Sequence, residues 1–134
     1  MSDETTQFVE EFEAMWRHPT PDGFAALFHP EGRLRHPSMP EAIPAAQAAG
    51  YMQTLQKTLP DISLEVHTWA ANGADVLLEY TLSASVNGQT VQWGGADRFT
   101  LRDGRAIEGV AYFDTRPLQA ALETAERTSG GVSR

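Results

Sequence analysis

The sequence contains no cysteine, and only one of its 134 residues is a lysine. The absence of cysteine excludes disulfides, thiolate nucleophiles and zinc sites built on cysteine. Ten basic residues stand against 18 acidic ones, and the net charge of −8 argues against binding to nucleic acid or to an anionic membrane surface. No apolar run approaches the roughly 20 residues that span a bilayer, and the acidic start does not resemble a secretory signal. These features predict a cytoplasmic protein with no nucleic-acid and no membrane partner.

The spacing of apolar residues changes once along the chain. The first part has helical spacing and the second part has the period of two that is typical of strands. The pattern predicts helices over residues 7–16, 20–28 and about 44–59, a short strand at 33–36, four strands at about 61–71, 74–86, 90–101 and 105–113, and a last helix that begins near residue 115. Helices followed by a long meander indicate an α+β fold. At roughly 150 residues per domain, we expect one domain over residues 1–127 and a polar tail over residues 128–134.

Period-two alternation also predicts which strand residues point inward. The even positions of 74–86 and the odd positions of 90–101 are mostly apolar, so Asp97 lies in the middle of an inward face. In 105–113 the odd positions, which include Ile107, form the inward face. His36 shares a face with Leu34 in the short strand. Burying either ionisable group costs several kcal/mol unless it is paired or its pKa shifts. Two such groups in an apolar interior are typical of a small-molecule site, with His36 and Asp97 as candidate catalytic residues. The candidate binding residues are Phe12, Trp16, Tyr51, Leu55, Tyr80, Leu82, Trp93, Ala111 and Phe113.

Each of these two residues alone also fits a purely structural role. His36 could be a hydrogen-bonded core histidine, and Asp97 could cap a loop or pair with an arginine. Because His36 and Asp97 are predicted to face the same cavity, the functional interpretation is favoured. Metal-ligand spacings and nucleotide-binding motifs are absent, so the sequence predicts no metal and no cofactor. The pair Gly94-Gly95 lies within a strand and indicates a bulge or a close approach.

The segment Asp97-Arg98-Phe99-Thr100-Leu101-Arg102-Asp103-Gly104-Arg105-Ala106-Ile107 resembles the D-x-F-x-x-x-D-G-K-I signature of the SnoaL-like polyketide cyclases. The resemblance to nuclear transport factor 2-like proteins covers residues 5–125. It implies a cone-shaped, curved antiparallel sheet with three N-terminal helices packed over its concave face and a short C-terminal helix. It also implies a homodimer through the outer sheet face, which here offers Gln92, Ala96, Thr100, Val110 and Tyr112.

The resemblance also assigns roles to single residues. His36 stands where ketosteroid isomerases place their catalytic base, and Asp97 where they place a protonated aspartate that donates to the substrate oxygen. The position of the isomerase tyrosine falls at Phe12, which cannot donate a hydrogen bond, and the inward histidine of the cyclases falls near Ser83, which the alternation places outside. The chain therefore matches neither active site completely.

Two mechanisms are open on this basis. A neutral His36 could abstract a proton next to a carbonyl while a protonated Asp97 stabilises the enolate. Alternatively, an ionised Asp97 could hydrogen-bond His36 and orient it as a base. Tyr51 and Tyr80 are candidate additional donors. We expect a cofactor-independent isomerase, cyclase or hydratase/dehydratase acting on a hydrophobic carbonyl compound; the alternative is a non-catalytic small-molecule-binding or dimerisation module.

Overall fold

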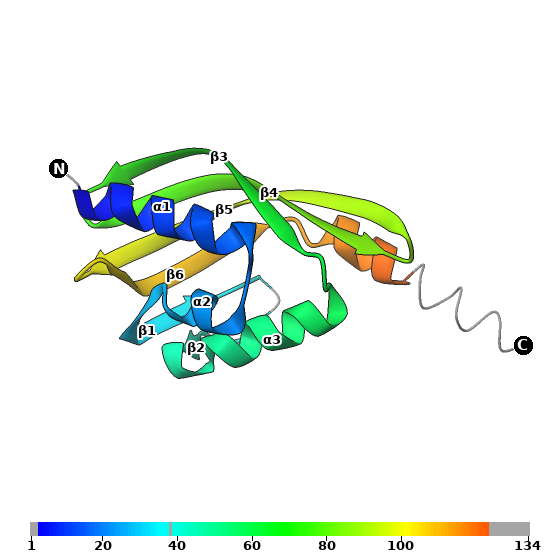
Figure 1. Ribbon diagram of the computed structural model, residues 1–134, viewed down its shortest axis with the longest axis horizontal. Coiled ribbons are helices and arrows are strands. Elements are labelled where there is room, and N and C mark those ends of the chain that lie inside the picture. The colour runs from blue at the N-terminus through cyan, green and yellow to red at the C-terminus, as the bar shows by residue number, and fades with distance from the viewer. Residues whose placement is uncertain (1–2, 38, 124–134) are drawn as a thin grey trace, which may run out of the picture.

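The structure, a computed structural model, describes residues 3–37 and 39–123, and its elements follow the order expected from the sequence (Figure 1). Helices α1, α2 and α3 precede a set of long strands, and residues 116–123 form a last helix. The elements are α1 (Asp3–Arg17), α2 (Pro21–Ala25), β1 (Phe28–Arg35), β2 (Ile43–Pro44), a 3₁₀ turn (Ala45–Gln47), α3 (Ala48–Thr58), β3 (Ser63–Asn72), β4 (Asp75–Val86), β5 (Gln89–Arg102) and β6 (Arg105–Phe113). The polar tail expected at 128–134 lies outside the described residues.

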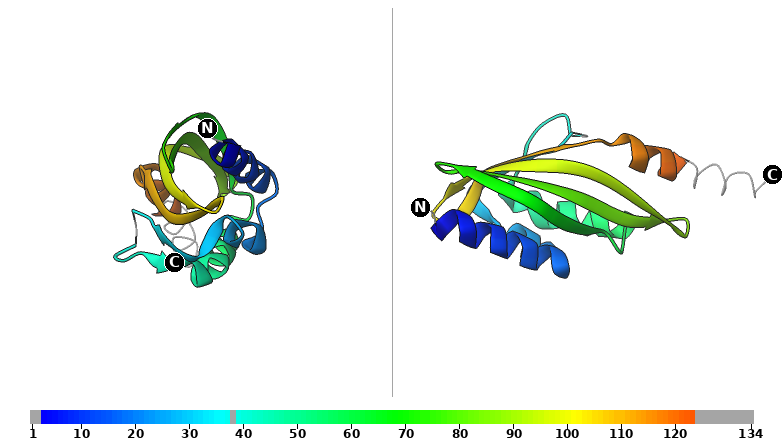
Figure 2. Two further views of the ribbon diagram at one scale, coloured as in Figure 1. Left: turned by 90° about the vertical axis from the view of Figure 1, so that its left-hand side faces the viewer. Right: turned by 90° about the horizontal axis from the view of Figure 1, so that it is seen from above.

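The six strands form one curved, unclosed sheet in the order β2-β1-β6-β5-β4-β3. Neighbouring strands are antiparallel except for β1 and β6, which are parallel. The sheet wraps around its concave side, and the three N-terminal helices lie across that side (Figure 2). The predicted α+β architecture is therefore confirmed, with one parallel pair that the sequence pattern did not indicate. Among the described residues, no helix combines the length and the apolar character needed to cross a bilayer.

Helix α2 begins as its sequence predicts but ends early. The Thr20 side chain accepts a hydrogen bond from the Gly23 backbone N–H at 2.9 Å, and Pro21 occupies the first turn. Strand β1 starts at Phe28, whereas the sequence predicted a break at residues 29–32 and a strand only from 33. The register against β6 shifts between Phe28 and Arg33, so an irregular stretch of β1 accommodates Pro30.

The segment before α3 also differs from the expected helix. Ile43 and Pro44 pair with β1, and the α-helix itself begins only at Ala48. A strand of two residues is too short to produce a period in the sequence, which is why it was not predicted.

The four strands of the meander are confirmed to within about two residues at each end. Two of their hairpins have tight turns in which both central residues have positive φ, namely Asn87-Gly88 (53° and 79°) and Asp103-Gly104 (55° and 78°). These turns fix the register and place the even residues of β4 in the core, as predicted. In β6 the register shifts where Leu101 pairs with Ala106, so Ala106 is fully buried and Ile107, expected inside, is only half-buried.

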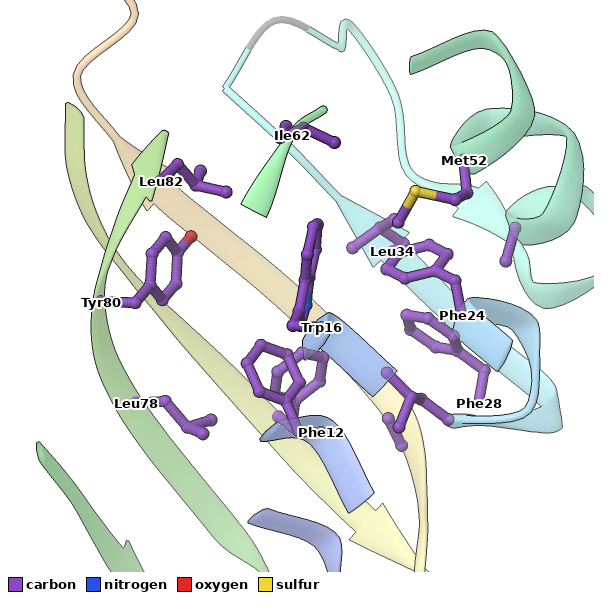
Figure 3. Close-up of a cluster of buried hydrophobic side chains, with 14 of the residues drawn as sticks. Phe12, Trp16, Phe24, Phe28, Leu34, Met52, Ile62, Leu78, Tyr80 and Leu82 are labelled. Carbon is purple, nitrogen blue, oxygen red and sulfur yellow. The ribbon is translucent and has the colours of Figure 1, made fainter. Parts of the chain in front are cut away.

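An aromatic cluster fills the core under α1. Phe99 of β5 lies 5.0 Å from the ring of Phe8, 5.6 Å from Phe12 and 6.2 Å from Phe28, measured between centroids. Figure 3 shows the side chains of α1 between those of β4 on one side and those of α2 and β1 on the other. Such tilted and edge-on pairs add to the free energy gained by burying the rings.

Candidate functional site

A cavity of about 400 Å³ lies between the concave face of the sheet, α3 and the last helix. Its size falls within the range of small-molecule pockets. Ten of the eleven predicted site residues line it, namely Trp16, His36, Tyr51, Leu55, Tyr80, Leu82, Trp93, Asp97, Ala111 and Phe113. The structure therefore brings together residues from helices, strands and the end of β1 that are far apart in the sequence.

Phe12 is the predicted site residue that the structure places elsewhere. It is buried, and its ring packs against Phe8, Trp16 and Phe99. Trp16 lies one helical turn later and does line the cavity. The helical period alone could not show how far along α1 the core ends and the cavity begins.

Asp97 faces the cavity from the middle of β5, as the alternation predicted. It pairs with Leu78 of β4 and Ala111 of β6, so its side chain emerges between two apolar neighbours. The Tyr80 hydroxyl, from the same face of β4, donates a hydrogen bond to Asp97 Oδ1 at 2.7 Å. A carboxyl group held by one tyrosine in an apolar wall keeps its other oxygen available to a ligand.

Gly95 makes this arrangement sterically possible. It pairs with Tyr80 on one side and Phe113 on the other. A Cβ at Gly95 would lie 2.6 Å from Phe113 Cβ and 3.1 Å from Tyr80 Cε1. The close approach predicted for the Gly94-Gly95 pair is therefore present at Gly95, where the missing Cβ leaves room for Tyr80 and Phe113.

The surroundings of Asp97 shift its protonation. Burial raises the pKa of Asp97 to about 7, and the hydrogen bond from Tyr80 offsets part of that rise. The group is therefore poised between its acid and carboxylate forms near neutral pH. Burial, together with the negative charge of Asp97, also raises the pKa of Tyr80 and of Tyr51, so both hydroxyls remain protonated donors.

His36 directly follows β1 and reaches the cavity beside two aromatic rings. Its imidazole meets Phe113 edge-on at 4.7 Å and Tyr51 at 5.5 Å between centroids. Burial lowers the pKa of His36, which favours the neutral imidazole at pH 7. A neutral imidazole can accept a proton, as both sequence-based mechanisms require.

Further lining residues were not predicted. The main additions come from α3 and the last helix, and they include Thr54, Thr58, Leu118, Gln119 and Leu122. Thr54 and Thr58 follow Tyr51 at spacings of three and seven, so they share its helix face, and this signal was present in the sequence. Across residues 3–37 and 39–123, no three His, Asp or Glu side chains gather as metal ligands.

The curved sheet, the helices across it and the cavity between them define a protein of the nuclear transport factor 2-like fold. The sequence matches the SnoaL-like domain over residues 9–109, so the chain belongs to the SnoaL-like family. No curated protein sequence matches this chain.

Solved structures show the same fold. AclR from Streptomyces galilaeus, a candidate hydroxylase, is 24% identical with a TM-score of 0.77, over 90% of this chain and 96% of its own. A candidate SnoaL-like polyketide cyclase from Jannaschia sp. CCS1 is 22% identical with a TM-score of 0.76, over 91% and 95% of the two chains. IdmH from Streptomyces antibioticus, a candidate polyketide cyclase, is 14% identical with a TM-score of 0.77, over 91% and 99%. At these identities the similarity concerns the fold.

Proposed function

We propose that the cavity binds a hydrophobic, carbonyl-containing small molecule and catalyses a cofactor-independent acid–base reaction on it, of the isomerase, cyclase or hydratase/dehydratase type. The observation that carries this proposal is the Tyr80–Asp97 hydrogen bond in a cavity wall that His36 also lines. A purely structural carboxyl group would more commonly be paired with a cation or fully hydrogen-bonded. Here it faces a space large enough for a ligand.

The reaction that fits these residues starts with enolisation. Neutral His36 takes a proton from the carbon next to the carbonyl, and the electron pair moves to the carbonyl oxygen. In one version protonated Asp97 donates to that oxygen while Tyr80 donates to the other carboxyl oxygen. In the other version ionised Asp97 supports the imidazolium that forms on His36. The similarity to candidate polyketide cyclases agrees with enolate chemistry, and TerC, similar in fold at 19% identity, was crystallised with polyporic acid.

Deuterium exchange tests the enolisation directly. The protein is incubated with 4-phenylcyclohexanone in D₂O, and loss of the α-proton signals is followed by NMR. We expect His36→Ala to slow the protein-dependent exchange by roughly 10²-fold or more, the usual contribution of a general base. The matched control is His67→Ala, because His67 is exposed on β3 and bonds Thr81. Exchange at the same rate in both variants would contradict the role of His36.

Two substitutions of Asp97 separate the two versions. The amide of Asp97→Asn can donate a hydrogen bond but cannot ionise, whereas Asp97→Ala can do neither. If Asp97 acts as a protonated donor, the asparagine variant retains more activity than the alanine variant. If it acts as a carboxylate, both lose activity equally. Asp103→Asn, at an exposed hairpin tip where asparagine tolerates positive φ, is the control.

A homodimer through the outer sheet face is a second proposal, and it applies equally to a non-catalytic module. Leu77 of β4 and Tyr112 of β6 are exposed on this face to 47% and 59%. These two side chains offer apolar area that a second copy of the chain would bury in such an interface. Sedimentation analysis would support the dimer if the mass rises to that of two chains as the concentration increases. The mass of one chain at all concentrations would contradict it.

A further inference from the structure

We propose that the mouth of the cavity is a second recognition site, which binds an uncharged hydrogen-bonding group at the far end of an elongated ligand. The inference rests on the proposed function, because the first end of the ligand is the carbonyl near Asp97. The residues of this mouth site are Thr54 and Thr58 of α3 and Gln119 of the last helix. All three line the cavity and are also exposed to solvent, which places them at its opening.

Helix α3 gives the separation between Asp97 and the far end of the mouth site. Tyr51 lies near the charge of Asp97, and Thr58 follows seven residues later, a rise of roughly 10 Å along the helix. The last helix and the C-terminal end of α3 lie at the same end of the molecule (Figure 1). A ligand that reaches both sites is therefore about 10 Å long or more.

The wall between the two sites is apolar. Leu55, Leu59, Leu82, Trp93 and Leu122 line it. A ligand segment there gains free energy by leaving water. The four leucines offer it no hydrogen bond, and the buried indole N–H of Trp93, which has no partner among the described residues, is the one donor among these side chains. The ligand that fits has an apolar middle and a polar group at each end.

The mouth site is uncharged although both helices that form it carry charges. Lys57 of α3 and Arg116 and Glu123 of the last helix do not line the cavity. Within the described residues, the side chains of Thr54, Thr58 and Gln119 have no hydrogen-bond partner in the protein, so their donors and acceptors remain available. Hydroxyl and amide groups suit a neutral amide or hydroxyl, whereas a carboxylate would find no arginine or lysine among the residues that line the cavity and would face a chain of net charge −8.

The test uses 4-arylcyclohexanones that differ only at the para position of the ring. The cyclohexanone supplies the carbonyl, and the para group is a carboxamide, a methyl group or a carboxylate. We expect calorimetry on the wild type to show that the carboxamide compound binds more tightly than the methyl compound by up to about tenfold, as one or two net hydrogen bonds allow. The carboxylate compound should bind more weakly than the carboxamide.

The near-isosteric substitutions Thr58→Val and Gln119→Leu should remove the advantage of the carboxamide and leave the affinity of the methyl compound within about twofold. The matched controls are Thr68→Val on β3 and Gln53→Leu on α3, since both residues are exposed and neither lines the cavity. Far-UV circular dichroism confirms that each variant is folded.

A carboxamide advantage that persists in Thr58→Val and Gln119→Leu would overturn the mouth site, and so would equal binding of all three compounds to the wild type. Either result would leave the proposed function standing if the methyl compound still binds and still exchanges its α-protons. If none of the compounds binds, the proposed carbonyl site fails, and the mouth site fails with it.

Discussion

Replacing Asp97 by asparagine should change how the stability of the protein depends on pH. Burial raises the pKa of Asp97 from its ordinary 3.8 to about 7. Between these values the folded state holds a proton that the unfolded chain releases, so raising the pH favours unfolding. The resulting loss of folding stability is absent below about pH 4 and reaches its full size above pH 7. A difference of roughly three pKa units corresponds to about 4 kcal/mol at most.

The asparagine variant cannot ionise at this position, so it escapes that cost. We expect the difference in free energy of unfolding between Asp97→Asn and the wild type to rise, in favour of the variant, by roughly 2–3 kcal/mol from pH 5 to pH 8. Other titrating groups are common to both proteins and cancel in the difference. Urea unfolding, followed by the fluorescence of the buried residues Trp16 and Trp93, gives the free energy of unfolding at each pH.

The Asp103→Asn variant is the control. Its carboxyl group is exposed, with His29 at 3.9 Å, so its stability relative to the wild type should change far less between pH 5 and pH 8 than that of Asp97→Asn. A stability difference between Asp97→Asn and the wild type that stays constant from pH 5 to pH 8 would refute the reasoning. It would mean that Asp97 is ionised throughout this range and that the cavity wall does not favour its protonated form.

Three further predictions concern the neighbours of Asp97 and the outer face. Gly95→Ala should lower the free energy of unfolding by about 1–3 kcal/mol, because its Cβ would overlap Phe113 Cβ at 2.6 Å. Gly94→Ala should be tolerated, because its Cβ meets only a carbonyl oxygen at 3.8 Å. Urea unfolding of both variants checks this. Tyr80→Phe removes the hydrogen bond that lowers the pKa of Asp97, so the carboxyl ¹³C titration should move to higher pH, and a midpoint that stays unchanged would contradict the assignment. Tyr112→Glu should shift sedimentation from dimer to monomer if the outer face is the interface, without altering ligand binding in the cavity.

The inward position of Asp97 could be predicted from the sequence because local signals determine it. The turns at Asn87-Gly88 and Asp103-Gly104 define where β5 begins and ends, and alternation between them then decides which side chains face the core. Tyr80 and Trp93 were placed by the same reasoning.

The remaining features depend on partners far away in the sequence. The bulge that puts Ala106 rather than Ile107 in the core appears only when β5 and β6 are paired. The early start of β1 at Phe28 likewise depends on its parallel pairing with β6. The hydrogen bond from Tyr80 to Asp97 needs the register of two strands and the space left by Gly95, which no single segment of sequence shows.

The position of Asp97 on a central strand has a consequence for redesign. Strand β5 is paired on both sides, by β4 and by β6, so the backbone that carries the carboxyl group has little freedom to move. The exposed cavity residues Thr54, Thr58 and Gln119 belong instead to helices outside the sheet. A combinatorial library at these three positions would therefore vary the opening of the cavity while leaving the carboxyl group and its tyrosine in place. The chain is in this respect a scaffold in which the residues at the opening can be varied separately from the carboxyl group.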